Sequence, residues 1–319
     1  MNRYHRQELY EAIGKQGQKK IGKAIVAIVG IGALGSVSSE LLCRAGIGRL
    51  ILIDRDFVDL TNLQRQVLYE ESDIGKPKAI AAEDHLKKIN SEIKIQSHVI
   101  DLNFRNIEDI LKEANIIIDG TDNLETRFLI NEYSLKCKKP WVHGSAIQDK
   151  GFVMSFSGNA PCFQCIIKEA DVSGTCDTVG ITNSITSLIG SLQTSECIKM
   201  ILGRNETSLI HVQLMNNKFD VMPIKNNPKC PACNGNYDYL EGRKGHKIIR
   251  FCKTGQFQIF PNKQLNLKEI KIILQKSSKV DDLGFCLVFK GIKIFKDRVI
   301  IPAKTEEEAK SFYSRFIGN

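Results

Sequence analysis

A short polar segment, residues 58–66, places an amide side chain, Asn62, three residues before a guanidinium, Arg65. It follows a glycine-rich run, residues 30–35 (Gly-Ile-Gly-Ala-Leu-Gly), and an acidic residue, Asp54. Glycines let the backbone approach a phosphate closely, and a guanidinium offers a planar fork of donors that matches phosphate oxygens. Because a triphosphate carries more charge than the pyrophosphate of a redox dinucleotide, this combination favours a nucleoside triphosphate. The alternative interpretation is a solvated polar loop.

The glycine-rich run lies between a predicted strand and a predicted helix. Residues 25–29 (Ile-Val-Ala-Ile-Val) are typical of a buried strand, and a helical pattern follows the glycines as far as Ala45. The N-terminus of such a helix presents free N–H groups and the positive end of its dipole to a phosphate. Asp54 closes the next strand, where a carboxylate suits ribose hydroxyls. NAD and FAD enzymes share this arrangement, so an NAD-dependent oxidoreductase stays open as an alternative that a nicotinamide-binding titration would decide.

Strand-like and helix-like segments alternate as far as about Gly203. The expected strands are residues 25–29, 50–54, 93–99, 116–119 and 141–145, and the expected helices between them include residues 79–89 and 127–137. This alternation predicts an α/β fold, a Rossmann-like, doubly wound and largely parallel sheet with helices on both faces. Ligands of such sheets bind outside the carboxyl ends of the strands, so we expect Gly30, Asp54 and residues 119–122 to meet there.

The cysteines divide into paired and unpaired residues. Two Cys-x-x-Cys pairs, Cys162 with Cys165 and Cys230 with Cys233, lie far apart in the sequence. Four thiolates in two such turns form a closed tetrahedral Zn²⁺ site with no open position for catalysis, so we predict a structural zinc that holds a distant segment onto the main domain. A redox dithiol is the alternative. Cys43 and Cys197 lie in helical patterns among apolar residues and are expected in the core.

The carboxy-terminal segment differs in charge and pattern. Residues 246–319 carry 15 Lys and Arg against 7 Asp and Glu, whereas the first 245 residues carry 30 against 29. Together with the pattern of short strands and two capped helices, opened by Asn266 and by Thr305, this predicts two domains. We expect a main domain over residues 1–240, which includes the zinc knuckles, and a small basic α+β domain over residues 246–319.

Several motifs in this order resemble the ThiF/MoeB/HesA family of adenylyltransferases, which are like the ubiquitin-activating enzymes. Besides the segments above, the resemblance rests on residues 3–7 (Arg-Tyr-His-Arg-Gln), 75–78 (Gly-Lys-Pro-Lys) and 119–123 (Asp-Gly-Thr-Asp-Asn), and it covers roughly residues 1–235. It implies ATP-dependent adenylation of the terminal carboxylate of a small ubiquitin-like or sulfur-carrier protein that ends in Gly-Gly, with release of pyrophosphate. A non-catalytic scaffold subunit of such an enzyme is a further alternative.

The resemblance also implies roles for individual residues. Asp54 would hold the ribose, Lys78 would contact the α-phosphate, and Asp122 would bind Mg²⁺. Arg6 would reach the phosphates across the interface of a homodimer. The implied nucleotide-binding residues are Gly30, Gly32, Gly35, Asp54, Asn62, Arg65, Lys78, Asp122 and Asn123.

Cys176, in the segment Gly174-Thr-Cys-Asp-Thr-Val-Gly180, is the candidate nucleophile. The resemblance implies that a cysteine here forms a thioester or acyl-disulfide with the carrier, although Val179 stands where alanine is usual. An inert loop thiol is the alternative. No sulfurtransferase loop of the Cys-Arg-x-Gly type follows Cys233, so we expect any sulfur to come from a separate sulfurtransferase.

Composition and charge limit the location and the kinds of partner that we expect. No run approaches the ~20 apolar residues of a membrane span, and the first residues have no apolar segment typical of a secretory signal, so we expect a cytoplasmic protein without a membrane partner. The net charge of +9 comes mostly from residues 246–319. That basic segment would suit an acidic carrier or a tRNA, and a merely solvated lysine-rich surface is the alternative.

Overall fold

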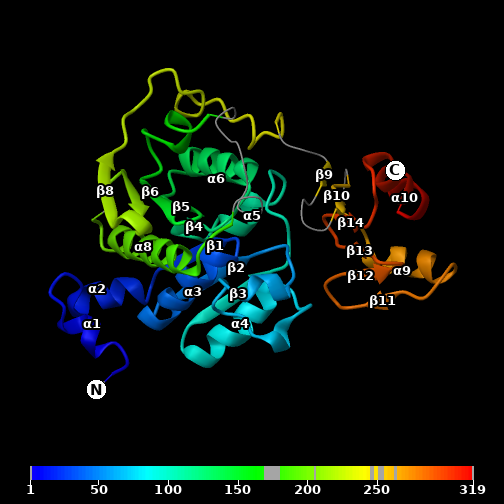
Figure 1. Cartoon of the computed structure of the whole chain (residues 1–319), viewed down its shortest axis with the longest axis horizontal. Coiled ribbons are helices and arrows are strands. Elements are labelled where there is room, and N and C mark those ends of the chain that lie inside the picture. The colour runs from blue at the N-terminus through cyan, green and yellow to red at the C-terminus, as the bar shows by residue number, and fades with distance from the viewer. Residues whose placement is uncertain are drawn as a thin grey trace. The chain divides into compact units, whose positions relative to one another are not determined.

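A computed structural model describes residues 2–168, 180–204, 206–244, 248–250, 255–261 and 264–317. The chain forms two compact units, Met1–Arg243 and Lys244–Asn319 (Figure 1). Each unit has its own sheet and its own apolar core.

The first unit is built on an eight-stranded sheet with the order β3-β2-β1-β4-β5-β6-β7-β8. The pairings from β3 to β5 are parallel, and those from β5 to β8 are antiparallel. The strands are β1 (Ile25–Val29), β2 (Arg49–Ile53), β3 (Lys94–His98), β4 (Ile116–Asp119), β5 (Trp141–Ile147), β6 (Lys150–Phe156), β7 (Ser208–Gln213) and β8 (Lys218–Pro223). The predicted α/β fold class is thus confirmed.

Alternate residues of the central strands pack against helices on opposite faces of the sheet. Val26 and Ile28 of β1 belong to one core with helices α3, α4 and α8, whereas Ala27 and Val29 belong to another with α5 and α6 (Figure 1). The helices are α3 (Ala33–Ala45), α4 (Lys78–Ile89), α5 (Ile107–Leu111), α6 (Leu124–Cys137) and α8 (Asn183–Ile201). Both faces are therefore covered, as a doubly wound sheet requires.

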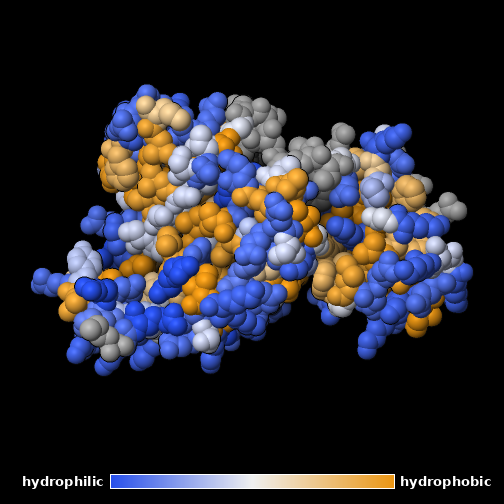
Figure 2. Space-filling model, turned by 60° about the horizontal axis from the view of Figure 1, so that its bottom comes forward, coloured by the Kyte–Doolittle hydropathy of each residue, from blue (hydrophilic) through white to orange (hydrophobic). Residues whose placement is uncertain are grey.

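Shorter elements complete the first unit. They are α1 (His5–Leu9), α2 (Gly14–Ile21), and the short 3₁₀ turns η1 (Leu60–Asn62), η2 (Glu71–Asp73), η3 (Phe163–Cys165), η5 (Leu214–Asn216) and η6 (Ala232–Asn234). The edge strand β8 leaves Phe219, Val221 and Met222 exposed. Figure 2 shows apolar residues in separate patches among polar ones on the face that it draws. Within the part of the chain described, no helix is both long and apolar enough to span a membrane.

The second unit is an antiparallel sheet with two helices. Its strand order is β11-β12-β13-β14-β10-β9, formed by β9 (Ile248–Arg250), β10 (Phe257–Ile259), β11 (Asp281–Asp282), β12 (Leu287–Phe289), β13 (Ile292–Ile294) and β14 (Val299–Ile301). Helices α9 (Leu267–Gln275) and α10 (Glu306–Phe316) contribute Ile270, Leu274 and Ala309 to its core. Asn266 and Thr305 cap these helices, as predicted, by accepting hydrogen bonds from the backbone of the first turn.

Candidate functional site

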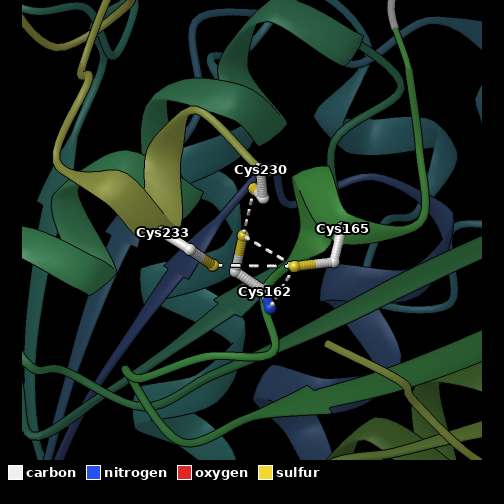
Figure 3. Close-up of side chains that lie close together, drawn as sticks. All are labelled: Cys162, Cys165, Cys230 and Cys233. Atoms are coloured by element: carbon white, nitrogen blue, oxygen red, sulfur yellow. Dashed lines mark hydrogen bonds between the residues drawn. The ribbon is translucent and has the colours of Figure 1, made fainter. Parts of the chain in front are cut away.

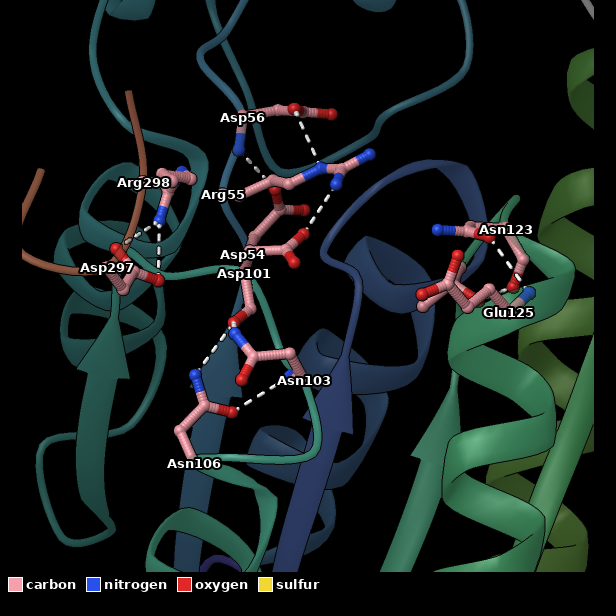
Figure 4. A network of polar contacts seen from close by, with 11 residues as sticks. Asp54, Arg55, Asp56, Asp101, Asn103, Asn106, Asn123, Glu125, Asp297 and Arg298 are labelled. Carbon is pink, nitrogen blue, oxygen red and sulfur yellow. Dashed lines mark hydrogen bonds and ion pairs between the residues drawn. The ribbon is translucent and has the colours of Figure 1, made fainter. Parts of the chain in front are cut away.

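The carboxyl ends of three neighbouring strands bring the predicted nucleotide-binding segments together. Val29 of β1 pairs with Ile53 of β2 on one side and with Asp119 of β4 on the other, so the three strands end at the same level. Gly30, Asp54 and Gly120 directly follow these strand ends. Figure 4 shows the polar residues that follow β2 and those that open α6 at this edge of the sheet.

Two glycines of the predicted loop are required by close backbone packing. Gly30 has φ +84°, and a Cβ on it would lie 2.8 Å from the carbonyl group of Gly120. A Cβ on Gly35 would lie 1.9 Å from the carbonyl oxygen of Gly30, so helix α3 could not approach β1 with any larger residue there. Gly30 and Gly35 therefore hold strand and helix together, and their role follows from packing inside the protein.

Gly32 has different surroundings. A Cβ on Gly32 would have only the side-chain nitrogen of Gln66 near it, at 3.8 Å, and Gly32 is the N-cap of α3 without any side-chain cap. The position of a Cβ on Gly32 is thus open space next to the N-terminus of α3, the positive end of the helix dipole. The side chain of Gln66 lies beside Gly32, and Gln66 is 4 % exposed. Its amide oxygen has no hydrogen-bond partner among the described residues.

Asp54 is buried and fastens the glycine loop. One of its carboxylate oxygens accepts a hydrogen bond from the N–H of Ile31 and the other from the N–H of Asp56, each at 2.7 Å. Burial raises the pKa of Asp54, and the nearby Lys78 opposes this effect. Each carboxylate oxygen retains acceptor capacity, so the position still suits a ribose hydroxyl.

Lys78 is the first residue of α4 and lies 7 % exposed near a group of carboxylates. Its Nζ is 3.5 Å from Oδ2 of Asp56. Burial opposes its charged form, but the carboxylates of Asp56, Asp54 and Asp122 together raise the pKa of Lys78. The ammonium group is therefore a stable cation at neutral pH, close enough to Asp122 to interact with it.

The polar segment after β2 forms a turn rather than a flexible loop. The side chain of Asn62 accepts a hydrogen bond from the N–H of Asp59 as part of a capping box, and it is 6 % exposed. Arg65 donates to the carbonyl of Thr61 at 3.0 Å and makes no ion pair with any described residue. The turn therefore presents a guanidinium that no carboxylate of the described residues pairs with, and such a group suits phosphate oxygens.

The loop after β4 carries the remaining two predicted residues. Asp122 is exposed and has no hydrogen bond or ion pair with a described residue, so its carboxylate is available to a cation. Asn123 is the N-cap of α6, where its side chain accepts from the N–H of Glu125 at 2.9 Å (Figure 4). The side-chain oxygen of Asn123 therefore caps α6, a structural role that the sequence analysis did not assign.

Arg6 lies away from this edge of the sheet within its own chain. Arg6 is an exposed residue of α1. Tyr4, the N-cap of α1, accepts a hydrogen bond from Asn90, which directly follows α4. Lys78 stands at the other end of α4, a 12-residue helix about 18 Å long. The structure therefore does not bring Arg6 together with Lys78 in one chain.

The four paired cysteines converge on one point (Figure 3). The Sγ atoms of Cys162 and Cys230 are 3.6 Å apart, those of Cys165 and Cys233 are 3.6 Å apart, and those of Cys162 and Cys165 are 3.9 Å apart. Four thiolates at 2.3 Å from a tetrahedral zinc would be about 3.8 Å from one another, so the arrangement fits Zn²⁺. Asn131 supports it by donating to the sulfur of Cys162.

The remaining cysteines have different outcomes. Cys43 and Cys197 are fully buried, as predicted. Burial raises the pKa of the Cys43 thiol to about 11, so it is not a reactive thiolate. Cys137 is exposed and Cys286 is buried. The candidate nucleophile Cys176 lies within residues 169–179, outside the described part of the chain.

Several polar residues that the sequence analysis did not assign also lie at this edge. Asp56 faces Lys78, Gln66 faces Gly32, and Asp119 forms a buried pair with His143. The motif at residues 119–123 already contained Asp119, but no local signal linked it to His143, because the two residues meet only through the pairing of β4 with β5.

Comparisons with known proteins show which family the chain resembles. Residues 4–232 match the model of the ThiF family. The chain is 32 % identical to the Sulfur carrier protein ThiS adenylyltransferase of Bacillus subtilis, covering 99 % of both chains. It is 34 % identical to the Molybdopterin-synthase adenylyltransferase of Escherichia coli, covering 73 % of this chain and 96 % of that one.

A solved structure shares the fold of the first unit. The crystal structure of E. coli MccB with ATP superposes with a TM-score of 0.65 at 26 % identity, covering 73 % of this chain and 75 % of that one. Together with the matched family model, these similarities identify the chain as a member of the ThiF family.

Proposed function

We propose that this protein is an ATP-dependent adenylyltransferase that activates the terminal carboxylate of a small ubiquitin-like or sulfur-carrier protein. A carboxylate oxygen of the carrier would attack the α-phosphorus of ATP. The bond from that phosphorus to the bridging oxygen would break, and pyrophosphate would leave with the electron pair. The product would be a carrier with an acyl-adenylate at its end.

The observation that carries this proposal is the set of groups at the carboxyl ends of β1, β2 and β4. An uncapped helix N-terminus at Gly32 lies at the same edge as a cationic Lys78 and as Asp122, an exposed carboxylate that forms no ion pair with a described residue. Transfer of a nucleotidyl group depends mainly on positioning and on neutralising phosphate charge, and these groups supply both. The related adenylyltransferases suggest the reaction and the class of substrate.

Each group has a role in this proposal. The backbone at Gly32 approaches the phosphates and Asp54 holds the ribose. Asn62 and Arg65 bind the outer phosphates, and Lys78 neutralises the charge that develops on the α-phosphate. Gly30 and Gly35 act indirectly, because they allow α3 to pack against β1 so that its N-terminus reaches the site.

Two metal ions belong to the proposal. Asp122 would hold Mg²⁺, since a free carboxylate is the ligand that this cation prefers, and Mg²⁺ would neutralise phosphate charge. Asn123 would contribute through the cap that sets the start of α6 beside Asp122. Cys162, Cys165, Cys230 and Cys233 would hold a structural Zn²⁺, for which their sulfur–sulfur distances fit.

We further propose a homodimer in which Arg6 of one copy reaches the phosphates of the other. The position of α1 supports a contribution from a second copy, because Tyr4, the N-cap of α1, accepts a hydrogen bond at the end of α4 that is remote from Lys78 of the same chain. Cys176 would attack the acyl-adenylate through its thiolate, so that AMP leaves and a thioester forms. An acyl-disulfide would form by the same attack if a separate sulfurtransferase first transferred a persulfide sulfur to Cys176, and that sulfurtransferase would also supply the sulfur of a thiocarboxylate product.

Mass spectrometry of the carrier tests the proposed function directly. The full-length protein, ATP, Mg²⁺ and a Gly-Gly-terminated carrier should give a carrier species heavier by one adenylyl group. A carrier that lacks its last two glycines is the matched control and should stay unmodified. If no carrier acquires the adenylyl group while the protein binds ATP, the adenylyltransferase proposal is wrong and a scaffold role gains support.

A further inference from the structure

Asp119, the last residue of β4, is fully buried and carries a charge within the site's supporting structure. Its Oδ1 accepts hydrogen bonds from the N–H of Thr121 at 2.9 Å and from the hydroxyl of Thr121 at 2.6 Å. Its Oδ2 lies 3.4 Å from Nε of Arg127 and 2.7 Å from Nδ1 of His143. These contacts lower the pKa of Asp119 in spite of its burial, so it is ionised.

Thr121, the residue directly before Asp122, is fixed from both sides by this group. Asp119 holds its N–H, and the guanidinium of Arg127 donates to its carbonyl oxygen. The backbone that leads into Asp122 therefore has both of its hydrogen-bonding groups engaged. Any movement of Asp119 would shift this backbone, and with it the carboxylate of Asp122.

His143 supplies a hydrogen bond that no other described residue replaces. The Nε of Arg127 has no hydrogen-bond partner in the described structure, so its contact with Oδ2 of Asp119 is an ion pair without hydrogen-bond geometry. His143 is thus the single hydrogen-bond donor to Oδ2 among the described residues. A buried carboxylate oxygen left without a donor is costly, so Asp119 would rearrange if His143 lost its ring N–H.

The imidazole ring of His143 is itself held in place by aromatic neighbours. It is 3 % exposed, and its centroid lies 5.0 Å from that of Phe163 in an edge-on arrangement and 6.1 Å from that of Trp141. Phe163 is fixed in turn, because its N–H donates to Asn131 at 2.9 Å. These aromatic neighbours therefore hold the ring in the orientation in which Nδ1 faces Asp119.

We infer that His143 is a positioning residue that sets the metal-binding geometry of Asp122 by holding Asp119 against Thr121. This inference rests on the proposed function, in which Asp122 binds the divalent cation. His143 does not touch substrate. It acts through Asp119 and through the backbone of Thr121.

Two substitutions test the hydrogen-bond donor of His143 and its aromatic ring one at a time. Asparagine can place its amide N–H where Nδ1 stands, so His143→Asn keeps the hydrogen bond and removes the ring. Phenylalanine keeps a ring against Phe163 and removes the donor. The readout is the affinity of the full-length protein for Mn²⁺ in the presence of ATP, measured by electron paramagnetic resonance, together with melting temperature and zinc content.

His143→Phe should weaken Mn²⁺ binding about tenfold or more, because a hydrogen bond to a charged group is lost, whereas His143→Asn should stay within about threefold of the wild type. Both should keep the zinc content of the wild type. Mn²⁺ affinity that is unchanged in His143→Phe, or equally weakened in both variants, would overturn the inference. A merely structural role would lower the melting temperature of both variants without this difference in Mn²⁺ affinity.

The same assay separates this inference from the proposed function. Asp122→Asn should weaken Mn²⁺ binding by itself, and adding His143→Phe to it should weaken it little further. If the protein binds Mn²⁺ and ATP in this way but adenylates no carrier, the proposed function fails while the role of His143 stands. Independent, additive losses in the double variant would contradict the role of His143.

Discussion

Alanine substitutions at Gly32 and Gly35 should separate nucleotide binding from folding, because the two glycines have different surroundings. A Cβ on Gly35 would lie 1.9 Å from the carbonyl oxygen of Gly30, whereas a Cβ on Gly32 would have its nearest neighbour at 3.8 Å. Gly35→Ala should therefore destabilise the fold. Gly32→Ala should leave the fold intact and obstruct the ligand.

The cost of Gly35→Ala follows from the overlap. Helix α3 or the loop must move by about 1.5 Å to restore ordinary contact distance, and overpacking of this kind costs up to about 3 kcal/mol. Alanine inside a helix recovers about 1 kcal/mol relative to glycine. The net loss of about 2 kcal/mol corresponds to a melting temperature roughly 4–8 °C below the wild type.

Gly32→Ala places a methyl group beside the first N–H groups of α3, where the phosphates would approach. The dissociation constant for ATP should rise about tenfold, equivalent to about 1.4 kcal/mol, while the melting temperature changes by about 1 °C or less. Calorimetric titration with ATP and thermal unfolding measure the two effects on the same samples. The wild-type protein is the control. Alanine at another glycine with open space around it, Gly75, would not serve, because the φ of Gly75 is +87° and alanine would be strained there. If Gly32→Ala binds ATP as the wild type does, the phosphates do not lie at the N-terminus of α3 and the site is misassigned.

Three further predictions follow from other parts of the structure. Removing one sulfur with Cys230→Ser should release the zinc and lower the melting temperature, and metal analysis that still finds one tightly held zinc per chain would contradict the four-cysteine site. Equal amounts of Arg6→Ala and Lys78→Ala chains, co-refolded from denaturant, should recover about a quarter of wild-type activity, since mixed dimers contain one complete site. No recovery in proven mixed dimers would contradict a contribution of Arg6 to the site of the other copy, and full activity of Arg6→Ala alone would place Arg6 outside the site. Asp73 lies buried against Lys76 and His85, and although burial opposes ionisation, these hydrogen bonds and that from the N–H of Glu70 lower its pKa to about 2. Because this folded-state pKa lies below the ordinary value of 3.8, Asp73 stabilises the fold above pH 3.8 and loses that contribution as the pH falls towards 2. Asp73→Asn should therefore cost about 2 kcal/mol at pH 7 and progressively less near pH 2, as measured by urea unfolding.

Much of the candidate site at the carboxyl ends of β1, β2 and β4 could be predicted because its signals are local. Gly30 and Asp54 each directly follow a strand of apolar residues, and Gly35 lies in the first turn of the helix after the first of these strands. Parallel strands align their ends without further information. Each Cys-x-x-Cys pair is an equally local signal, and the structure brings the two pairs together. The caps at Asn266 and Thr305 could be predicted for the same reason.

The remaining features depend on contacts between distant segments. The antiparallel strands β6, β7 and β8 extend the sheet beyond its parallel part, and their pairing partners are set by tertiary structure. His143 and Asp119 meet only through the pairing of β5 with β4. The helix cap formed by Asn123 could not be predicted from the motif, because asparagine occurs both at ligand-binding positions and at helix N-caps.

The central claim is that this edge of the sheet activates a carrier's carboxylate with ATP, and ATP–pyrophosphate exchange tests it most directly. The purified full-length protein would be assayed with labelled pyrophosphate, with and without small carriers that end in Gly-Gly. The account predicts exchange that requires a carrier and is lost in Lys78→Ala. Absence of exchange with every carrier tested, from a protein that is folded, zinc-loaded and dimeric, would contradict it.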